Sequence, residues 1–138
     1  MQEIIDHLHA SPAFYVATAD KSGNPHNRPF SLVFDYNGKV MFGTNKNKLV
    51  FHDLSENPKV EICASDDKKG TWLRFHGIVG FEEDKACKAK MFEVMPQLLS
   101  LYPGGAENPD AICFYIKEGQ ADFYNYSSMN APSKTIKV

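Results

Sequence analysis

Residues 24–58 read NPHNRPFSLVFDYNGKVMFGTNKNKLVFHDLSENP, and this stretch decides the fold. Residues 26–34 are predicted to form a strand. In its second half, Phe30, Leu32 and Phe34 place a large apolar side chain at every second position, as in a strand with one buried face. Asn37-Gly38 follows, and both residues tolerate the positive φ that a two-residue hairpin turn requires. Residues 39–43 then continue as another strand. The stretch therefore predicts two neighbouring antiparallel strands in a sheet-rich protein.

Pro29 interrupts the first of these strands. Proline has no N–H to donate to a neighbouring strand, so Pro29 is expected at a sheet edge or at a bulge. Backbone groups near a broken ladder are free to bind something else. The Arg28-Pro29 pair is therefore a candidate ligand-binding position.

The segment after the second strand has the composition of an anion site. A helix is predicted to begin near Lys48, and Thr44, Asn45 and Asn47 are all competent N-cap residues. A helix N-terminus offers free N–H groups and a partial positive charge, to which a hydroxyl and an ammonium group add. Because the two strands are predicted to be neighbours, this turn and Arg28 are expected at one end of one sheet.

The rest of the chain continues the pattern of strands with a few attached helices. Together the segments predict a mainly β fold of six to seven antiparallel strands, a closed or partly closed barrel in one domain, residues 1–138. The tail after Ser127 is polar and is expected to be loose. The other predicted strands are Phe14–Ala19, Lys59–Ala64, Thr71–Phe81, Ala111–Ile116 and Ala121–Tyr126, the last two joined by a turn at Glu118-Gly119. Helices are predicted for residues 3–9 and 82–95, and a further helix carries Leu49, Val50 and Leu54 and is stopped by Asn57-Pro58.

Composition argues against several function classes. The 138 residues carry a formal net charge of −2 with both signs interspersed, and no basic stripe is present, so nucleic acid is not expected as a partner. The N-terminus lacks the pattern of a signal peptide, and no apolar stretch has the length of a membrane span, so no membrane association is expected.

The cysteines point to a reducing compartment. Cys63, Cys87 and Cys113 are odd in number and widely spaced, without a C-x-x-C pair, so neither a zinc site nor a redox-active cysteine pair is indicated. They are expected as buried apolar residues. We therefore expect a cytoplasmic protein without a bound metal.

Three local motifs give the chain a family resemblance. They are the R-P-F tripeptide at residues 28–30, the F-G-T-N-x-N-K segment at residues 42–48, and the L-x-x-N-P helix stop at residues 54–58. Each motif is weak alone, but their order and spacing together are specific. In these motifs and in the order of its elements, the chain resembles the pyridoxamine 5′-phosphate oxidase-like family of FMN-binding split β-barrels.

The resemblance implies an FMN cofactor and assigns its contacts. In such proteins the segment that matches Asn27, Arg28 and Pro29 lies along the flavin ring and meets its polar edge. The positions that usually receive the FMN phosphate are those that match Thr44, Asn45 and Lys48.

The resemblance also implies a homodimer, because the family's flavin site lies between two subunits. Trp72, at the start of the fifth predicted strand, is the candidate contribution of the second subunit. The phosphate turn here is short and lacks a Ser-Arg-Lys ending, and the C-terminal segment is not basic. The chain therefore looks more like the small general FMN-binding and nitroimidazole-resistance-like branch than like a vitamin B6 oxidase.

The candidate residues also have purely structural interpretations. Arg28 could pair with Asp35 or Glu61 at the surface, and Lys48 could be a solvated helix residue. Trp72 could fill the core or an interface.

Three functions remain open from the sequence. The first is a flavin oxidoreductase with an unknown substrate and an electron donor such as NAD(P)H; catalysis would then rest on the cofactor, since no acid or base can be placed. The second is a non-enzymatic flavin-binding or electron-transfer module. The third is a haem-binding split barrel with His26 or His76 as the axial ligand.

Overall fold

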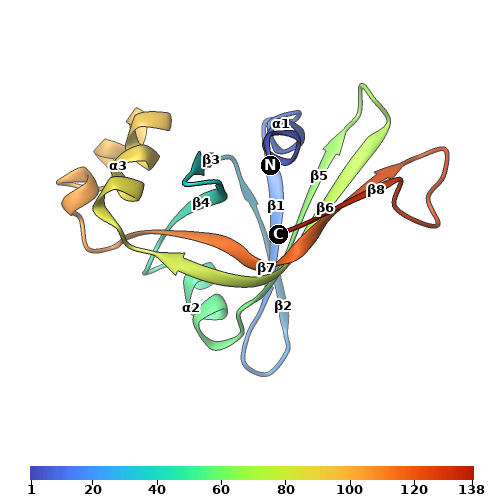
Figure 1. The fold of residues 1–138 in the computed structure, drawn as a ribbon. Coiled ribbons are helices and arrows are strands. Elements are labelled where there is room, and N and C mark those ends of the chain that lie inside the picture. The colour runs from blue at the N-terminus through green and yellow to red at the C-terminus, as the bar shows by residue number, and fades with distance from the viewer.

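A single curled antiparallel sheet forms most of the molecule, and the computed structural model describes all of residues 1–138 (Figure 1). The strand order is β2-β1-β5-β6-β7-β4-β3, with β8 beside β7, and every pair is antiparallel. The strands are β1 (Phe14–Ala19), β2 (Pro25–Phe30), β3 (Val33–Tyr36), β4 (Lys39–Asn45), β5 (Lys59–Asp66), β6 (Thr71–Glu82), β7 (Ala111–Asn125) and β8 (Lys134–Lys137), and the helices are α1 (Gln2–Leu8), α2 (Leu49–Glu56) and α3 (Lys85–Val94).

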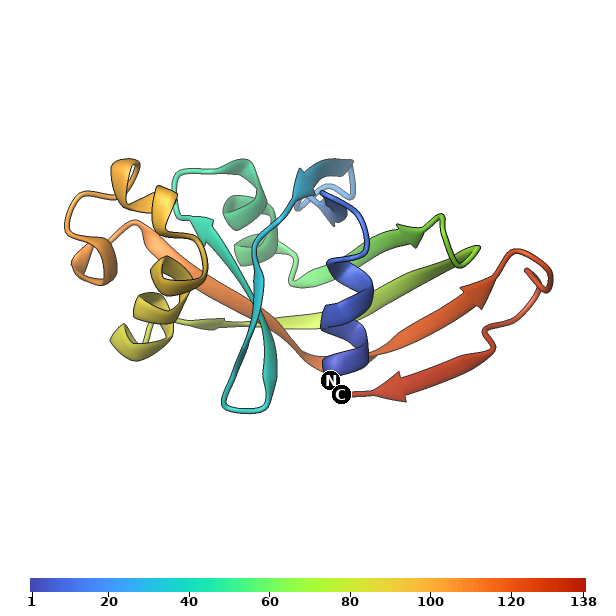
Figure 2. The ribbon, with the colours of Figure 1, turned by 90° about the horizontal axis from the view of Figure 1, so that it is seen from above.

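Two long strands, β6 and β7, run through the centre of the sheet and carry its curvature. Gly77 on β6 lies directly opposite Gly119 on β7, and the register between the strands shifts at Ile78/Val79. A Cβ atom at either glycine would overlap backbone of the other strand, so only glycine permits this approach. The bend produces the open, half-barrel shape seen from the side and from above (Figures 1 and 2). The prediction of a mainly β, partly closed barrel is confirmed.

Apolar side chains fill the concave side of the curl. Phe42 and Phe114 stack at its centre with ring centroids 5.2 Å apart, and Phe14 meets Phe42 edge to face at 5.7 Å. Ile4 and Leu8 of α1 close this core from the open side. A smaller apolar cluster lies under α3 and fixes that helix against β3, β4 and β7.

The hairpin at Asn37-Gly38 is confirmed, but the strand predicted before it is two strands. Asn37 and Gly38 both have positive φ, +50° and +72°, and β3 pairs with β4 around them. The predicted strand 26–34 is interrupted at Ser31-Leu32, so β2 pairs with β1 and lies at the opposite edge from β3. The expectation that β2 and β4 are paired neighbours was therefore wrong.

The C-terminal third also differs from its prediction. The two strands predicted around Glu118-Gly119 are one continuous strand, β7, because Gly119 faces Gly77 in the ladder instead of making a turn. The tail predicted to be loose contains β8, which extends the sheet beside β7. The third helix spans Lys85–Val94 rather than residues 82–95, and Pro96 begins a separate 3₁₀ turn.

The lengths and compositions of the helices bear on membrane crossing. None of the helices combines the length and the apolar character that crossing a bilayer requires.

Candidate functional site

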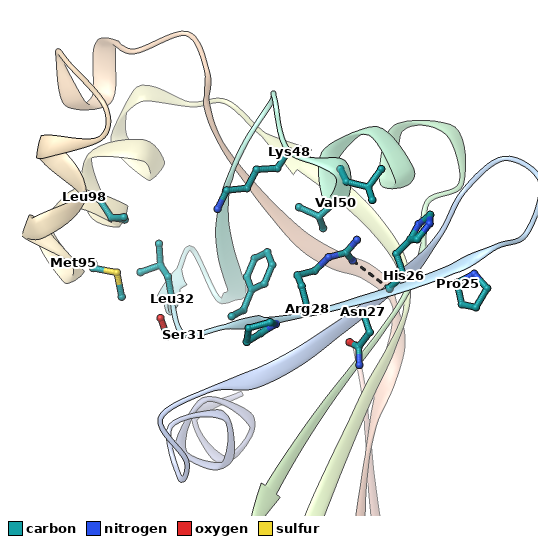
Figure 3. Close-up of a pocket in the computed structure, with 13 residues that line it drawn as sticks. Pro25, His26, Asn27, Arg28, Ser31, Leu32, Lys48, Val50, Met95 and Leu98 are labelled. Atoms are coloured by element: carbon teal, nitrogen blue, oxygen red, sulfur yellow. Dashed lines mark hydrogen bonds between the residues drawn. The ribbon is translucent and has the colours of Figure 1, made fainter.

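A cavity of about 770 Å³ lies between the edge strand β2 and the first turn of α2 (Figure 3). This volume is in the range of about 300–1,000 Å³ that is usual for small-molecule sites. Its far end is apolar and is made by Leu32 together with Met95 and Leu98 from the segment after α3. The cavity is lined by Pro25, His26, Asn27, Arg28, Pro29, Phe30, Ser31, Leu32, Lys48, Leu49, Val50, Met95 and Leu98.

Strand β2 gives this cavity an unpaired sheet edge. Pro29 pairs across to Tyr15 of β1, and β2 has no strand on its other side. The prediction that Pro29 lies at an edge is therefore confirmed, and its missing N–H breaks no ladder. Asn27 and Pro29 are exposed on this edge, where backbone groups can meet a ligand.

The first turn of α2 supplies the opposite wall. Lys48 is the N-cap residue, and its side chain forms no salt bridge or hydrogen bond within the chain. The backbone N–H groups of Leu49 and Val50, which lie in the same wall, donate no hydrogen bond either, as is usual in the first turn of a helix. An ammonium group and two free N–H groups at the positive end of a helix form a cradle for an anion.

Arg28 is held in the wall by neighbouring polar groups. Its Nη1 donates to the hydroxyl of Thr18 at 2.7 Å and to the carbonyl of Val16 at 3.1 Å. Its Nη2 lies 3.6 Å from the carboxylate of Asp53 on α2. Burial lowers the pKa of Arg28, although Asp53 opposes that effect, and a guanidinium remains charged in proteins. The alternative pairings with Asp35 or Glu61 are not formed, and Glu61 pairs with Arg74 instead.

Asp53 is the centre of a polar network that links α2 to β1 and β2. The side chain is only 2% exposed, and its Oδ2 accepts hydrogen bonds from Thr18 at 2.7 Å and from His26 Nδ1 at 2.8 Å. Burial alone would raise the pKa of the Asp53 carboxyl, but donors from Thr18 and His26 hold it below its ordinary value. A buried carboxylate thus stays ionised and anchors the side chains of Arg28 and His26 in the cavity wall.

Sequence reasoning missed Asp53, although one signal was present. Val50, Asp53 and Leu54 recur at the spacing of a single helix face, and all three are buried. A carboxylate on the buried stripe of a short helix requires polar partners, because an unpaired buried charge is strongly unfavourable.

The structure brings together four of the seven residues singled out from the sequence: Asn27, Arg28, Pro29 and Lys48 all line the one cavity. Arg28 and Lys48 therefore do share one rim, as expected. The route is different, because the break at Ser31-Leu32 and the curl of the sheet bring them together rather than a shared hairpin.

Thr44 and Asn45 lie a few residues before Lys48 in the chain, but neither lines the cavity. The hydroxyl of Thr44 is buried without a hydrogen-bond partner, the condition of a group that acquires its partner with a ligand. Oδ1 of Asn45 accepts a hydrogen bond of 2.7 Å from the backbone N–H of Asn47, which stabilises the turn. The prediction that Thr44, Asn45 or Asn47 caps α2 was wrong, since Lys48 occupies that position without a side-chain cap.

Trp72 lies apart from the cavity of its own chain. It begins β6 at the end of the sheet away from α3, where its ring stacks on Tyr124 with centroids 4.8 Å apart and planes 6° from parallel. In Figures 1 and 2 this end of the β5–β6 hairpin projects from the opposite side of the molecule from α3. The contribution of Trp72 to a partner subunit's site stays a prediction.

Comparison with solved structures gives close matches over the whole chain. A NimC/NimA family protein from Clostridium acetobutylicum superposes with a TM-score of 0.87 at 28% identity, covering 100% of this chain and 93% of that one. A pyridoxamine 5′-phosphate oxidase-related, FMN binding protein from Nostoc punctiforme gives 0.70 at 14% identity, covering 99% and 87%. An F420 reductase gives 0.61 at 16% identity, covering 95% and 94%. The last two matches bear on the fold alone.

Comparison of sequences identifies the family. No curated protein matches the chain. The family model described as pyridoxamine 5′-phosphate oxidase matches residues 1–120, which is most of the 138 residues. The chain therefore belongs to the pyridoxamine 5′-phosphate oxidase family.

Proposed function

We propose that the protein is an FMN-binding flavoprotein that transfers electrons from a reduced nicotinamide to a small acceptor. The observation that carries the proposal is the cavity wall at the start of α2, where Lys48 and the free N–H groups of Leu49 and Val50 face the same space as Arg28. Such a wall suits a phosphate, and the edge of β2 beside it suits the polar rim of a flat ring.

The residues present fit FMN. Lys48 and the first turn of α2 would hold the phosphate. Asn27 and the exposed edge of β2 would lie along the ring. Bound flavin supplies one- and two-electron redox chemistry, while the protein binds it, orients it and shields it from water. We place this activity in the reducing cytoplasm, in keeping with three cysteines that are all free.

The first experiment is the absorption spectrum of the purified protein after addition of FMN. The proposal expects the bands of oxidised flavin and their bleaching by NADH or NADPH, with recovery when an acceptor is added. Flavin bands that neither nicotinamide bleaches would indicate the alternative, a binding or electron-transfer module. A haem spectrum without flavin would contradict the proposal.

Replacing Lys48 with alanine should weaken FMN binding by about 1–3 kcal/mol, or roughly 5- to 150-fold in Kd, the range of a hydrogen bond to a charged group. Quenching of FMN fluorescence measures this affinity. Lys46→Ala is the matched control, because Lys46 lies two residues away but pairs with Glu83 outside the cavity. Equal affinities for Lys48→Ala and wild type would remove Lys48 from the site.

We further propose that two chains form a homodimer with FMN between them. The cavity is open on the side that faces solvent along β2, so one chain leaves a bound ring partly uncovered. The outer face of the sheet offers a surface for association, since Tyr15 is half exposed and stands beside exposed Cys63, with Trp72 and Tyr124 further along the same face.

Sedimentation velocity with bound FMN should therefore give the mass of two chains. Trp72→Ala should weaken FMN binding even though Trp72 lies outside the cavity of its own chain, because the proposal places it in the partner subunit's site. A monomer that holds FMN as tightly as the dimer would contradict this assembly.

A further inference from the structure

His26 lines the cavity, and its ring is held in place by a contact with Asp53. The imidazole is one of the side chains drawn around the cavity in Figure 3. Its Nδ1 lies 2.8 Å from Oδ2 of Asp53, whose side chain is 2% exposed, whereas the His26 side chain is 33% exposed. One nitrogen of the imidazole therefore faces a buried carboxylate, and the ring borders the cavity. The sequence could not place an acid or base here, because Asp53 lies 27 residues away from His26 on another element.

The charge of Asp53 determines which nitrogen carries the proton. The carboxylate can only accept hydrogen bonds when ionised, and the pKa of Asp53 lies below its ordinary value, so Nδ1 of His26 is its donor. A neutral His26 then has its lone pair on Nε2, which has no hydrogen-bond partner in the chain. A ring oriented in this way can accept or donate a proton at Nε2.

Charged groups face His26 from each neighbouring element. Asp53 approaches from α2 and Arg28 from β2, while Asp20 in the turn between β1 and β2 is close enough for His26 to contribute to lowering the pKa of its carboxyl. Thr18 of β1 completes the wall by donating to Asp53.

The other histidines lack this combination. His76 also has a carboxylate partner, Asp122 at 2.9 Å, but it lines a separate, smaller cavity of about 410 Å³. His7 has a hydroxyl as its hydrogen-bond partner and not a carboxylate, since its Nε2 lies 3.1 Å from Oγ1 of Thr71. His9 and His52 are exposed and make no side-chain hydrogen bond. Only His26 joins a buried carboxylate to the cavity that contains Arg28 and Lys48.

We propose that His26 is the proton-exchanging catalytic residue of this cavity and that Asp53 is its positioning residue. The inference rests on the proposed flavin function and names its acceptor class: a quinone, whose reduction to a hydroquinone takes up the proton that His26 can supply at the cavity wall. The quinone gains a hydride, two electrons and one proton, from the reduced flavin that the nicotinamide supplies. Nε2–H of His26 gives the second proton to the quinone oxygen, and solvent reprotonates the ring. The product is the hydroquinone.

The first test measures the ring itself and needs no activity. Nitrogen-edited NMR of the wild-type protein should show His26 protonated at Nδ1 when neutral, and Asp53→Asn should shift the tautomer towards Nε2–H. A wild-type ring protonated at Nε2 in its neutral form would overturn the positioning role of Asp53.

The second test uses menadione as the quinone, NADH or NADPH as donor, and protein loaded with FMN. His26→Asn keeps an amide near the position of Nδ1 and removes the proton-exchanging group. It should lower kcat by about 100-fold or more, with FMN affinity unchanged, and should flatten the pH profile of kcat. Asp53→Asn should give an intermediate loss. His52→Gln, one residue from Asp53 but exposed, is the matched control and should retain full activity.

The outcomes separate this inference from the function on which it rests. Wild-type protein that binds no FMN overturns both. Wild-type protein that binds FMN and turns over menadione, with His26→Asn equally fast, overturns only the proton role. FMN binding without turnover of menadione overturns the quinone as acceptor.

Discussion

Gly77→Ala should lower the free energy of unfolding by about 3 kcal/mol, the largest effect expected from adding a single methyl group to this chain. Gly77 has a φ of +153°, and an added Cβ would overlap the carbonyl oxygen of Glu118 and the Cα of Gly119. Both obstacles are backbone, so no side-chain rotation can relieve them. The two strands would have to separate where the sheet bends.

Gly23→Ala is the matched control for this prediction. Gly23 also has a positive φ, +88°, but nothing lies within 4 Å of the added Cβ. Gly23→Ala should lower the free energy of unfolding by about 1 kcal/mol, because only the cost of the left-handed backbone conformation applies. Chemical denaturation of both variants measures the difference, and equal losses would show that the close approach of β6 and β7 has no energetic importance.

Asp53→Asn should destabilise the protein by about 2 kcal/mol at neutral pH. Removing one partner of a buried ion pair typically costs about 3–5 kcal/mol. The lower value is expected here because the side chains of Arg28 and His26 are 20% and 33% exposed and keep some solvation. Asp35→Asn, an exposed carboxylate on β3 without a partner, should have no measurable effect.

The same variant should change how stability depends on pH. Folding lowers the pKa of the Asp53 carboxyl, so its contribution is fully present above the pKa of the unfolded chain and is lost as pH falls through the folded value. The difference between wild type and Asp53→Asn should therefore be constant near neutrality and shrink below about pH 4. Denaturant midpoints measured from pH 7 to pH 3 give the comparison, and a difference that grows on acidification would contradict the assignment.

Local patterns in the sequence predicted what depends on local structure. The Asn37-Gly38 turn determines its own φ angles, and the apolar positions of α2 follow one helix face, so both elements could be located. The break at Ser31-Leu32 could not, because extended residues on either side of it look the same in sequence. The pairing of β2 with β1 and of β3 with β4 places β2 and β3 at opposite edges of the curled sheet.

Long-range pairing also explains what was missed in the site. Gly119 resembles a turn residue until it is seen opposite Gly77, which is 42 positions earlier in the chain and belongs to β6. In the same way, His26 and Arg28 look like surface residues until α2 places Asp53 beneath them. Four of the candidate residues nevertheless line one cavity. Local structure explains this, because proline favours a sheet edge with free backbone groups and the first turn of a helix has free N–H groups.

The most direct test of the central claim compares FMN with riboflavin, which lacks the phosphate, on wild type and Lys48→Ala. If the phosphate lies against Lys48 at the start of α2, wild type prefers FMN, and Lys48→Ala loses affinity for FMN but not for riboflavin. An equal loss for both ligands, or no preference for FMN in the wild type, would show that the phosphate does not lie at this wall.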